Sequence, residues 1–111
     1  MRHTDMSPQD RYINQLFGIE DAHLLGIREA LRTDGKEGIN VGPYEGRLLQ
    51  MLTGLINAKR IIEVGTLYGY SRLWMARALP DDGKIISLEN NNAHHQKASE
   101  LLSKTESWGK V

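Results

Sequence analysis

The stretch IIEVGTLYGYS (residues 61–71) constrains the fold most strongly, because an apolar run ends there in a turn with two glycines. The run KRIIEV (59–64) lacks apolar–polar alternation, which is typical of a parallel strand covered on both faces. A helical pattern over 70–79, the turn PDDG and a second apolar run, KIISLE (84–89), follow. This order predicts two parallel strands joined by a right-handed crossover, the opening of a doubly wound α/β sheet.

Helical patterns surround this unit. Ser7 and Pro8 predict a helix start over residues 8–17, with serine as N-cap and proline in the first turn. Further helices are expected over 20–32 and 93–102, and 103–111 is expected to be a loop.

Another helix is expected to open at Pro43. Its residues Leu48, Leu52 and Leu55, flanked by further apolar residues, form a wide stripe that predicts a buried helix. Trp74, in the helix after the glycine turn, is expected in the core.

The composition excludes several classes of protein. Fourteen Lys and Arg balance fourteen Asp and Glu, and no basic run occurs, so nucleic acid is not expected as a partner. The absence of cysteine excludes disulfides, thiolate metal sites and a catalytic thiol. His94 and His95 are adjacent and would point apart on a helix, which predicts a solvated face and no metal site. No secretion signal and no membrane-length apolar run is found, so a cytoplasmic protein without membrane contact is expected.

The glycine turn is the candidate ligand site, because ligands of doubly wound sheets bind at the first strand-to-helix turn. Gly65 and Gly69 would let a ligand approach the backbone, and the amides that open the following helix are unpaired donors. Ser71 adds a hydroxyl. These groups suit a carboxylate or a phosphate, although a tight turn without a ligand would also explain the glycines.

Two acids narrow the ligand class. The spacing is G-x-x-x-G, without the third glycine of the dinucleotide fingerprint, and Glu63 lies two residues before the first glycine. A carboxylate there would repel a pyrophosphate but favour a ligand with an ammonium and a sulfonium, such as S-adenosylmethionine. Glu89 ends the second strand and could accept hydrogen bonds from both hydroxyls of an adenosine ribose, or could be a solvated charge.

INVGPYEG (39–46), followed by EVGTLYGYS (63–71) and ISLE (86–89), resembles the class I S-adenosylmethionine-dependent O-methyltransferases of the catechol and caffeoyl-CoA type. The likeness covers about residues 7–111. It implies a Rossmann-like, doubly wound α/β sheet of the seven-stranded methyltransferase type, of which this chain carries the N-terminal helices and first two strands. Residues 1–111 would be the N-terminal part of a single domain, with a helical lead-in over 1–58 and a cofactor-binding strand–helix–strand–helix unit over 59–103.

The resemblance also implies residue roles. Val41 would lie in the segment that closes over the methionine end of the cofactor, and Glu89 would hold the ribose. The remaining expected cofactor contacts, which form the methionine-binding loop, are Glu63, Gly65, Thr66, Gly69 and Ser71.

The implied reaction is methyl transfer from S-adenosylmethionine to a hydroxyl of a small, phenolic or catechol-like acceptor, and a homodimer is compatible with it. The family's metal ligands and catalytic lysine belong to later segments, so this chain receives no catalytic or metal-binding residue. A divalent metal such as Mg²⁺ is expected only in a full-length parent, and the chain alone is expected to be inactive. Two alternatives stay open: a nicotinamide-dependent oxidoreductase half-domain, and a non-catalytic cofactor-binding or assembly module.

Overall fold

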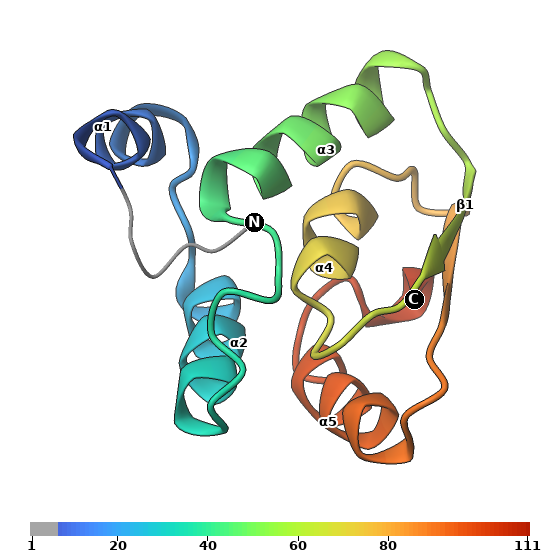
Figure 1. Cartoon of the computed structure of the whole chain (residues 1–111). Coiled ribbons are helices and arrows are strands. Elements are labelled where there is room, and N and C mark those ends of the chain that lie inside the picture. The colour runs from blue at the N-terminus through green and yellow to red at the C-terminus, as the bar shows by residue number, and fades with distance from the viewer. Residues whose placement is uncertain (1–6) are drawn as a thin grey trace.

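The computed structural model describes residues 7–111, so the first six residues of the expected lead-in lie outside it. Figure 1 shows a group of helices on one side of a small sheet, with α4 near the centre. The elements, in chain order, are α1 (Pro8–Phe17), α2 (Ala22–Thr33), α3 (Pro43–Leu55), β1 (Arg60–Val64), α4 (Tyr70–Ala76), β2 (Lys84–Leu88), α5 (Asn92–Leu102) and the 3-10 helix η1 (Trp108–Lys110).

The helix starts follow from capping. Ser7 Oγ accepts a hydrogen bond from the Asp10 amide at 3.1 Å, and the Asp10 carboxylate accepts one from the Ser7 amide, which confirms the predicted start of α1. Asp21 caps α2 through the Leu24 amide at 3.0 Å, so this helix begins two residues later than predicted. The predicted loop 103–111 also contains η1, which the sequence pattern did not indicate.

The two strands pair in parallel, with α4 as the crossover, as the sequence predicts. Ile62 lies opposite Ile86, and Val64 lies opposite Leu88. The next hydrogen bond of the ladder runs from the Gly65 amide to the Leu88 carbonyl at 2.7 Å. The glycine turn and the end of β2 therefore meet at one edge of the sheet.

Only one face of this sheet is covered by the described elements. Ile85 is fully buried in a cluster with Ala76 and Leu79, next to Ile61. On the other face Ile62, Val64, Ile86 and Leu88 are between 56% and 85% exposed. The prediction of strands covered on both faces is therefore wrong for residues 7–111, because the helices they form lie on one side of the sheet (Figure 1).

Helix α4 is the centre of the core. Leu73 and Trp74 are buried, which confirms the prediction for Trp74. They pack in one cluster with buried residues of the flanking helices: Leu24, Ile27 and Leu31 of α2, and Ala98 and Leu102 of α5.

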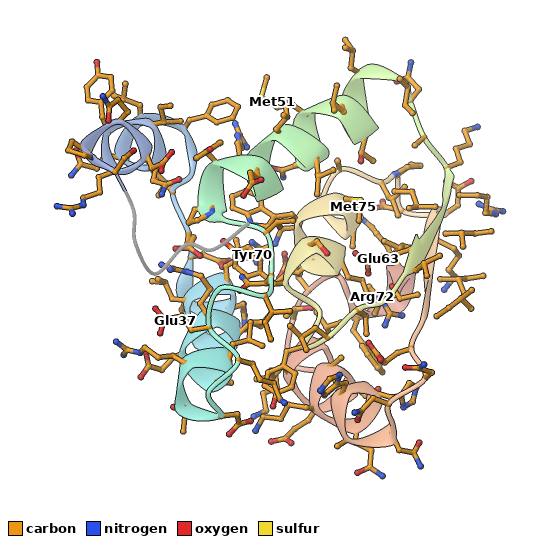
Figure 2. All side chains as sticks on the ribbon, viewed as in Figure 1. Glu37, Met51, Glu63, Tyr70, Arg72 and Met75 are labelled. Carbon is orange, nitrogen blue, oxygen red and sulfur yellow. The ribbon has the colours of Figure 1, made fainter. Side chains whose placement is uncertain are left out.

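The predicted burial of the leucine stripe on α3 is wrong. Leu48, Leu52 and Leu55 are 47% to 77% exposed, and Met51 points outward from the same helix (Figure 2). The buried side of α3 instead carries Pro43, Gly46 and Thr53. A Cβ on Gly46 would lie 2.2 Å from Cδ1 of Trp74, so α3 approaches α4 through its small residues. The bulky indole leaves no room there for leucine side chains.

Within residues 7–111, no helix combines the length and the apolar character that a membrane crossing requires.

We predict that Gly46→Ala destabilises the chain by about 1–3 kcal/mol, because the added methyl group overlaps the rigid Trp74 ring. Urea unfolding measures the loss. The control is Gly26→Ala in α2, where a Cβ has open space and alanine favours the helix. That control should stabilise the chain by up to about 1 kcal/mol. Equal unfolding free energies for wild type and Gly46→Ala would contradict the close α3–α4 contact.

Candidate cofactor site

A pocket of about 280 Å³ lies between the glycine turn and the segment that precedes α3. Five of the seven residues predicted to bind the cofactor line it: Val41, Gly65, Thr66, Ser71 and Glu89. Two predicted residues, Glu63 and Gly69, are not part of its lining. The structure thus brings together three segments that are separated by 18 or more residues in the sequence.

Gly65 has the conformation and the open space expected of a glycine that faces a ligand. Its φ of +83° is one that other residues rarely adopt, and a Cβ built on it would have no atom within 4 Å. Leu67, two residues on, also has a positive φ of 51°. At Gly65 the turn therefore presents bare backbone toward the pocket.

Gly69 is required for a different reason. Its φ is +86°, and a Cβ on it would lie 2.7 Å from Cδ1 of Leu102 in α5. The expectation that Gly69 makes room for a ligand is therefore wrong, because Leu102 occupies that space. Gly69 lets the turn enter α4, whose N-cap it forms, while α5 packs directly against it.

Glu63 lies beneath the turn and is held by two hydroxyls. Its Oε1 accepts a hydrogen bond from Ser87 Oγ at 2.8 Å, and its Oε2 accepts one from Ser71 Oγ. Figure 2 shows Arg72 beside it, between β1 and α4. Burial lowers the pKa of Arg72, and the charge of Glu63 offsets part of that shift. Glu63 thus fixes Ser71, which lines the pocket, to the neighbouring strand β2.

Glu89, the residue after β2, is hydrogen-bonded directly to the glycine turn after β1. Its Oε1 accepts hydrogen bonds from the amides of Thr66 and Leu67 at 3.1 and 3.0 Å, and its Oε2 accepts one from the Asn91 amide at 3.1 Å. Burial alone would raise the pKa of Glu89, but these three bonds outweigh it and lower the pKa. Two amides of the turn are therefore occupied by a side chain of the protein, while the amides that open α4, which the sequence suggested for a ligand carboxylate, are not the ones that Glu89 binds.

A carboxylate offers about four acceptor positions, so Glu89 retains about one for a ligand. A second cavity of about 560 Å³ opens beyond the ends of both strands and is also lined by Gly65 and Glu89. Glu89 therefore lies where the two cavities meet, at the carboxyl edge of the sheet. An elongated ligand that filled both would pass this carboxylate.

Thr66 contributes a polar atom without a partner. Its side chain is buried, and Oγ1 has no hydrogen-bond partner among the described residues although Thr66 lines the pocket. Such atoms are rare in folded proteins and call for a ligand or a water molecule.

Two tyrosines of the turn are functional candidates that the sequence reasoning missed. The Tyr68 hydroxyl donates to Asp34, and this hydrogen bond is the main cause that raises the pKa of Tyr68 to about 12. The Tyr70 hydroxyl donates to Glu20 Oε2 at 2.6 Å, and Arg28 binds the same carboxylate through two contacts of 2.7 Å. Their spacing in GTLYGYS gives no sign of partners 34 and 50 residues away.

The two histidines differ. His95 is exposed, as predicted, whereas the His94 ring packs edge-on against Tyr68 with centroids 6.0 Å apart. The prediction of a solvated face is wrong for His94. Across residues 7–111, no three His, Cys, Asp or Glu side chains gather closely enough to hold a metal ion.

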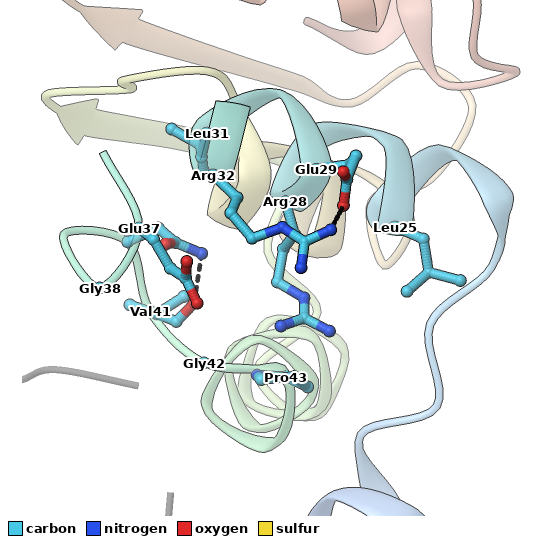
Figure 3. Close-up of a pocket in the computed structure, with 11 residues that line it drawn as sticks. Leu25, Arg28, Glu29, Leu31, Arg32, Glu37, Gly38, Val41, Gly42 and Pro43 are labelled. Carbon is cyan, nitrogen blue, oxygen red and sulfur yellow. Dashed lines mark hydrogen bonds and ion pairs between the residues drawn. The ribbon is translucent and has the colours of Figure 1, made fainter. Parts of the chain in front are cut away.

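A further cavity, of about 170 Å³, lies on the other side of the segment that precedes α3 (Figure 3). It shares Leu31, Asn40 and Val41 with the first pocket. Its two arginines are paired, Arg28 with Glu20 and Arg32 with Glu29.

Comparison with known proteins identifies the family. An O-methyltransferase family model matches residues 18–111. The chain is 44% identical over 95 residues to a catechol O-methyltransferase from Niastella koreensis, covering 86% of this chain and 43% of that protein. It is 37% identical over 87 residues to a caffeoyl-CoA O-methyltransferase from Populus kitakamiensis, covering 77% of this chain and 37% of that protein.

Among solved structures, an O-methyltransferase from Bacillus cereus in complex with SAH matches with a TM-score of 0.87 and 28% identity. The match covers 95% of this chain and 48% of that one. The fold is that of the N-terminal part of a Rossmann-like methyltransferase sheet. The chain belongs to the O-methyltransferase family, and it spans less than half the length of the relatives named here.

We predict that Glu89→Gln lowers the free energy of unfolding at neutral pH by about 1–3 kcal/mol, because the turn amides lose a charged acceptor. The folded-state pKa of Glu89 lies below its ordinary value of 4.5. The stability from its charge is therefore present above pH 4.5 and lost as the pH falls through the lowered pKa.

Urea unfolding from neutral pH down to about pH 3 should thus show the difference between wild type and Glu89→Gln shrinking in acid. The control is Glu100→Gln on the exposed part of α5, which should show little difference throughout. A difference for Glu89→Gln that stays constant with pH would contradict the role of the charge.

Proposed function

We propose that the site binds S-adenosylmethionine, and that the parent protein transfers its methyl group to a hydroxyl of a small, catechol-like or other phenolic acceptor. The observation that carries this proposal is the charge of the site. Among the linings that residues 7–111 give to the two cavities at the turn, Glu89 is the one carboxylate, and no lysine or arginine is present. A cationic sulfonium and ammonium fit such a site better than a pyrophosphate does.

The residues present fit the cofactor. The bare backbone at Gly65 leaves room for close approach, and Thr66 Oγ1 is a buried hydroxyl that needs a partner. Glu89 retains acceptor capacity for a ribose hydroxyl. Val41 and Ile39 would cover the methionine end from the opposite wall. The relative from Bacillus cereus, solved with SAH, supports this assignment.

When bound, S-adenosylmethionine supplies an electrophilic methyl group on a positively charged sulfur. The contribution of this chain is to bind and orient: Glu89 holds the turn in shape, Glu63 fixes Ser71, and Val41 forms part of the opposite wall. We assign no residue of this chain to deprotonation of the acceptor and none to a metal ion.

The homodimer and the cytoplasmic location remain predictions.

The alternatives are less well supported. A nicotinamide dinucleotide would place its pyrophosphate at a turn where Glu89 already binds two of the amides and where no lysine or arginine of the described residues lines the pocket. A non-catalytic cofactor-binding module uses the same pocket and differs only in the absence of turnover. Isothermal titration with SAH and with NADH distinguishes the proposed function from the nicotinamide-dependent alternative. We expect heat of binding with SAH and none with NADH.

We predict that Gly65→Val abolishes SAH binding, because a branched side chain would enter the open space at the turn and does not tolerate a positive φ. Gly65→Ala, with one added carbon, should bind SAH more weakly than wild type. The control is Gly109→Val, where a Cβ also has open space but the residue lies outside both cavities.

Titration calorimetry measures the affinities, and urea unfolding shows that each variant is folded. If folded Gly65→Val binds SAH like wild type, the turn does not contact the cofactor and the proposed site is wrong.

A further inference from the structure

The pocket has two walls that come from separate parts of the chain. One wall is the turn over residues 65–71, and the other consists of Ile39, Asn40 and Val41 in the segment between α2 and α3. A ligand that contacts both walls is bound tightly only when their separation is correct. The contacts that set this separation therefore bear on affinity.

The segment between α2 and α3 is held at its α3 end. The Gly42 amide donates to Glu45 Oε1 at 2.9 Å, and Gly42 and Pro43 are buried. In the middle, Val41 packs against the core, but Ile39 is exposed and the cavity beside α2 lies behind Asn40 and Val41 (Figure 3). The segment thus has space on both sides.

At its α2 end the segment is tied to the opposite wall. Asp34, the C-cap of α2, is exposed, and its carboxylate accepts a hydrogen bond from the Tyr68 hydroxyl. The Tyr68 ring is itself fixed, because it is 4% exposed and packs in the core and against His94. A buried ring from the turn therefore holds Asp34, the first residue of the segment that leads to the wall of Ile39, Asn40 and Val41.

Resting on the proposed function, we propose that Tyr68 and Asp34 form a positioning pair that sets the separation of the two walls and thereby the affinity for the cofactor. Both tyrosine rings are buried, but their partners differ: Asp34 is exposed, whereas Tyr70 donates to Glu20, whose side chain is 5% exposed and paired with Arg28. That second contact lies in the core and stabilises the fold. The Tyr68–Asp34 contact instead joins the turn to an exposed residue of the segment that carries the opposite wall, and acts on the separation of the two walls.

The test uses Tyr68→Phe, which keeps the ring and removes only the hydroxyl. SAH affinity measured by titration calorimetry should fall by about tenfold, because the segment is no longer fixed in the free chain and binding has to order it again. In the chain without ligand, hydrogen exchange over residues 36–41 should become about tenfold faster or more, while the urea midpoint changes little.

The partner residue gives an independent variant. Asp34→Ala should weaken SAH binding like Tyr68→Phe, and Asp34→Asn, which retains an acceptor, should recover part of the affinity. The double variant Tyr68→Phe/Asp34→Ala should bind no more weakly than the weaker single variant, since both remove one interaction. Tyr12→Phe, on the exposed face of α1, is the matched control and should bind like wild type. Tyr70→Phe should instead lower the urea midpoint.

If Tyr68→Phe binds SAH with the affinity of the wild type, or if its hydrogen exchange over residues 36–41 is unchanged, the positioning role is wrong. The proposed function would still stand in either case. Additive losses in the double variant would likewise overturn the pair. Failure of the wild-type chain to bind SAH would overturn the proposed function together with this inference.

Discussion

The parallel pairing of β1 and β2 is the constraint on which the site depends. With Val64 opposite Leu88, the residue after each strand, Gly65 and Glu89, comes to the same edge of the sheet. The carboxylate of Glu89 then reaches the amides of Thr66 and Leu67. These bonds support a turn in which a leucine adopts a positive φ, a conformation that is costly for a bulky residue. A shift in register would separate the acid from the turn.

Much of this arrangement could be predicted from the sequence, because local chemistry dictates it. The glycine turn after an apolar run indicated the strand-to-helix site, and Ser7 with Pro8 indicated the first helix. The gathering of Val41, Gly65, Thr66, Ser71 and Glu89 around one pocket agrees with the family resemblance, while their contacts with a cofactor stay a prediction.

The remainder depended on tertiary packing. The apolar stripe of α3 gave no indication that Trp74 would pack against the side of the helix that carries Gly46. The reason for a glycine at position 69 was hidden as well, since Leu102 lies 33 residues away in a helix whose docking no local pattern specifies. The partners of Tyr68 and Tyr70 were equally hidden, because a tyrosine hydroxyl can donate to any carboxylate that the fold brings near.

The uncovered face of the sheet has a consequence for the behaviour of the chain in solution. Ile62, Val64, Ile86 and Leu88 form a flat aliphatic surface on two paired strands. At neutral pH the chain has a formal net charge of zero, so long-range repulsion does not keep such surfaces apart. Colloidal stability should therefore be lowest near neutrality and improve as the pH moves away from it, until loss of the carboxylate charge at Glu89 begins to loosen the turn.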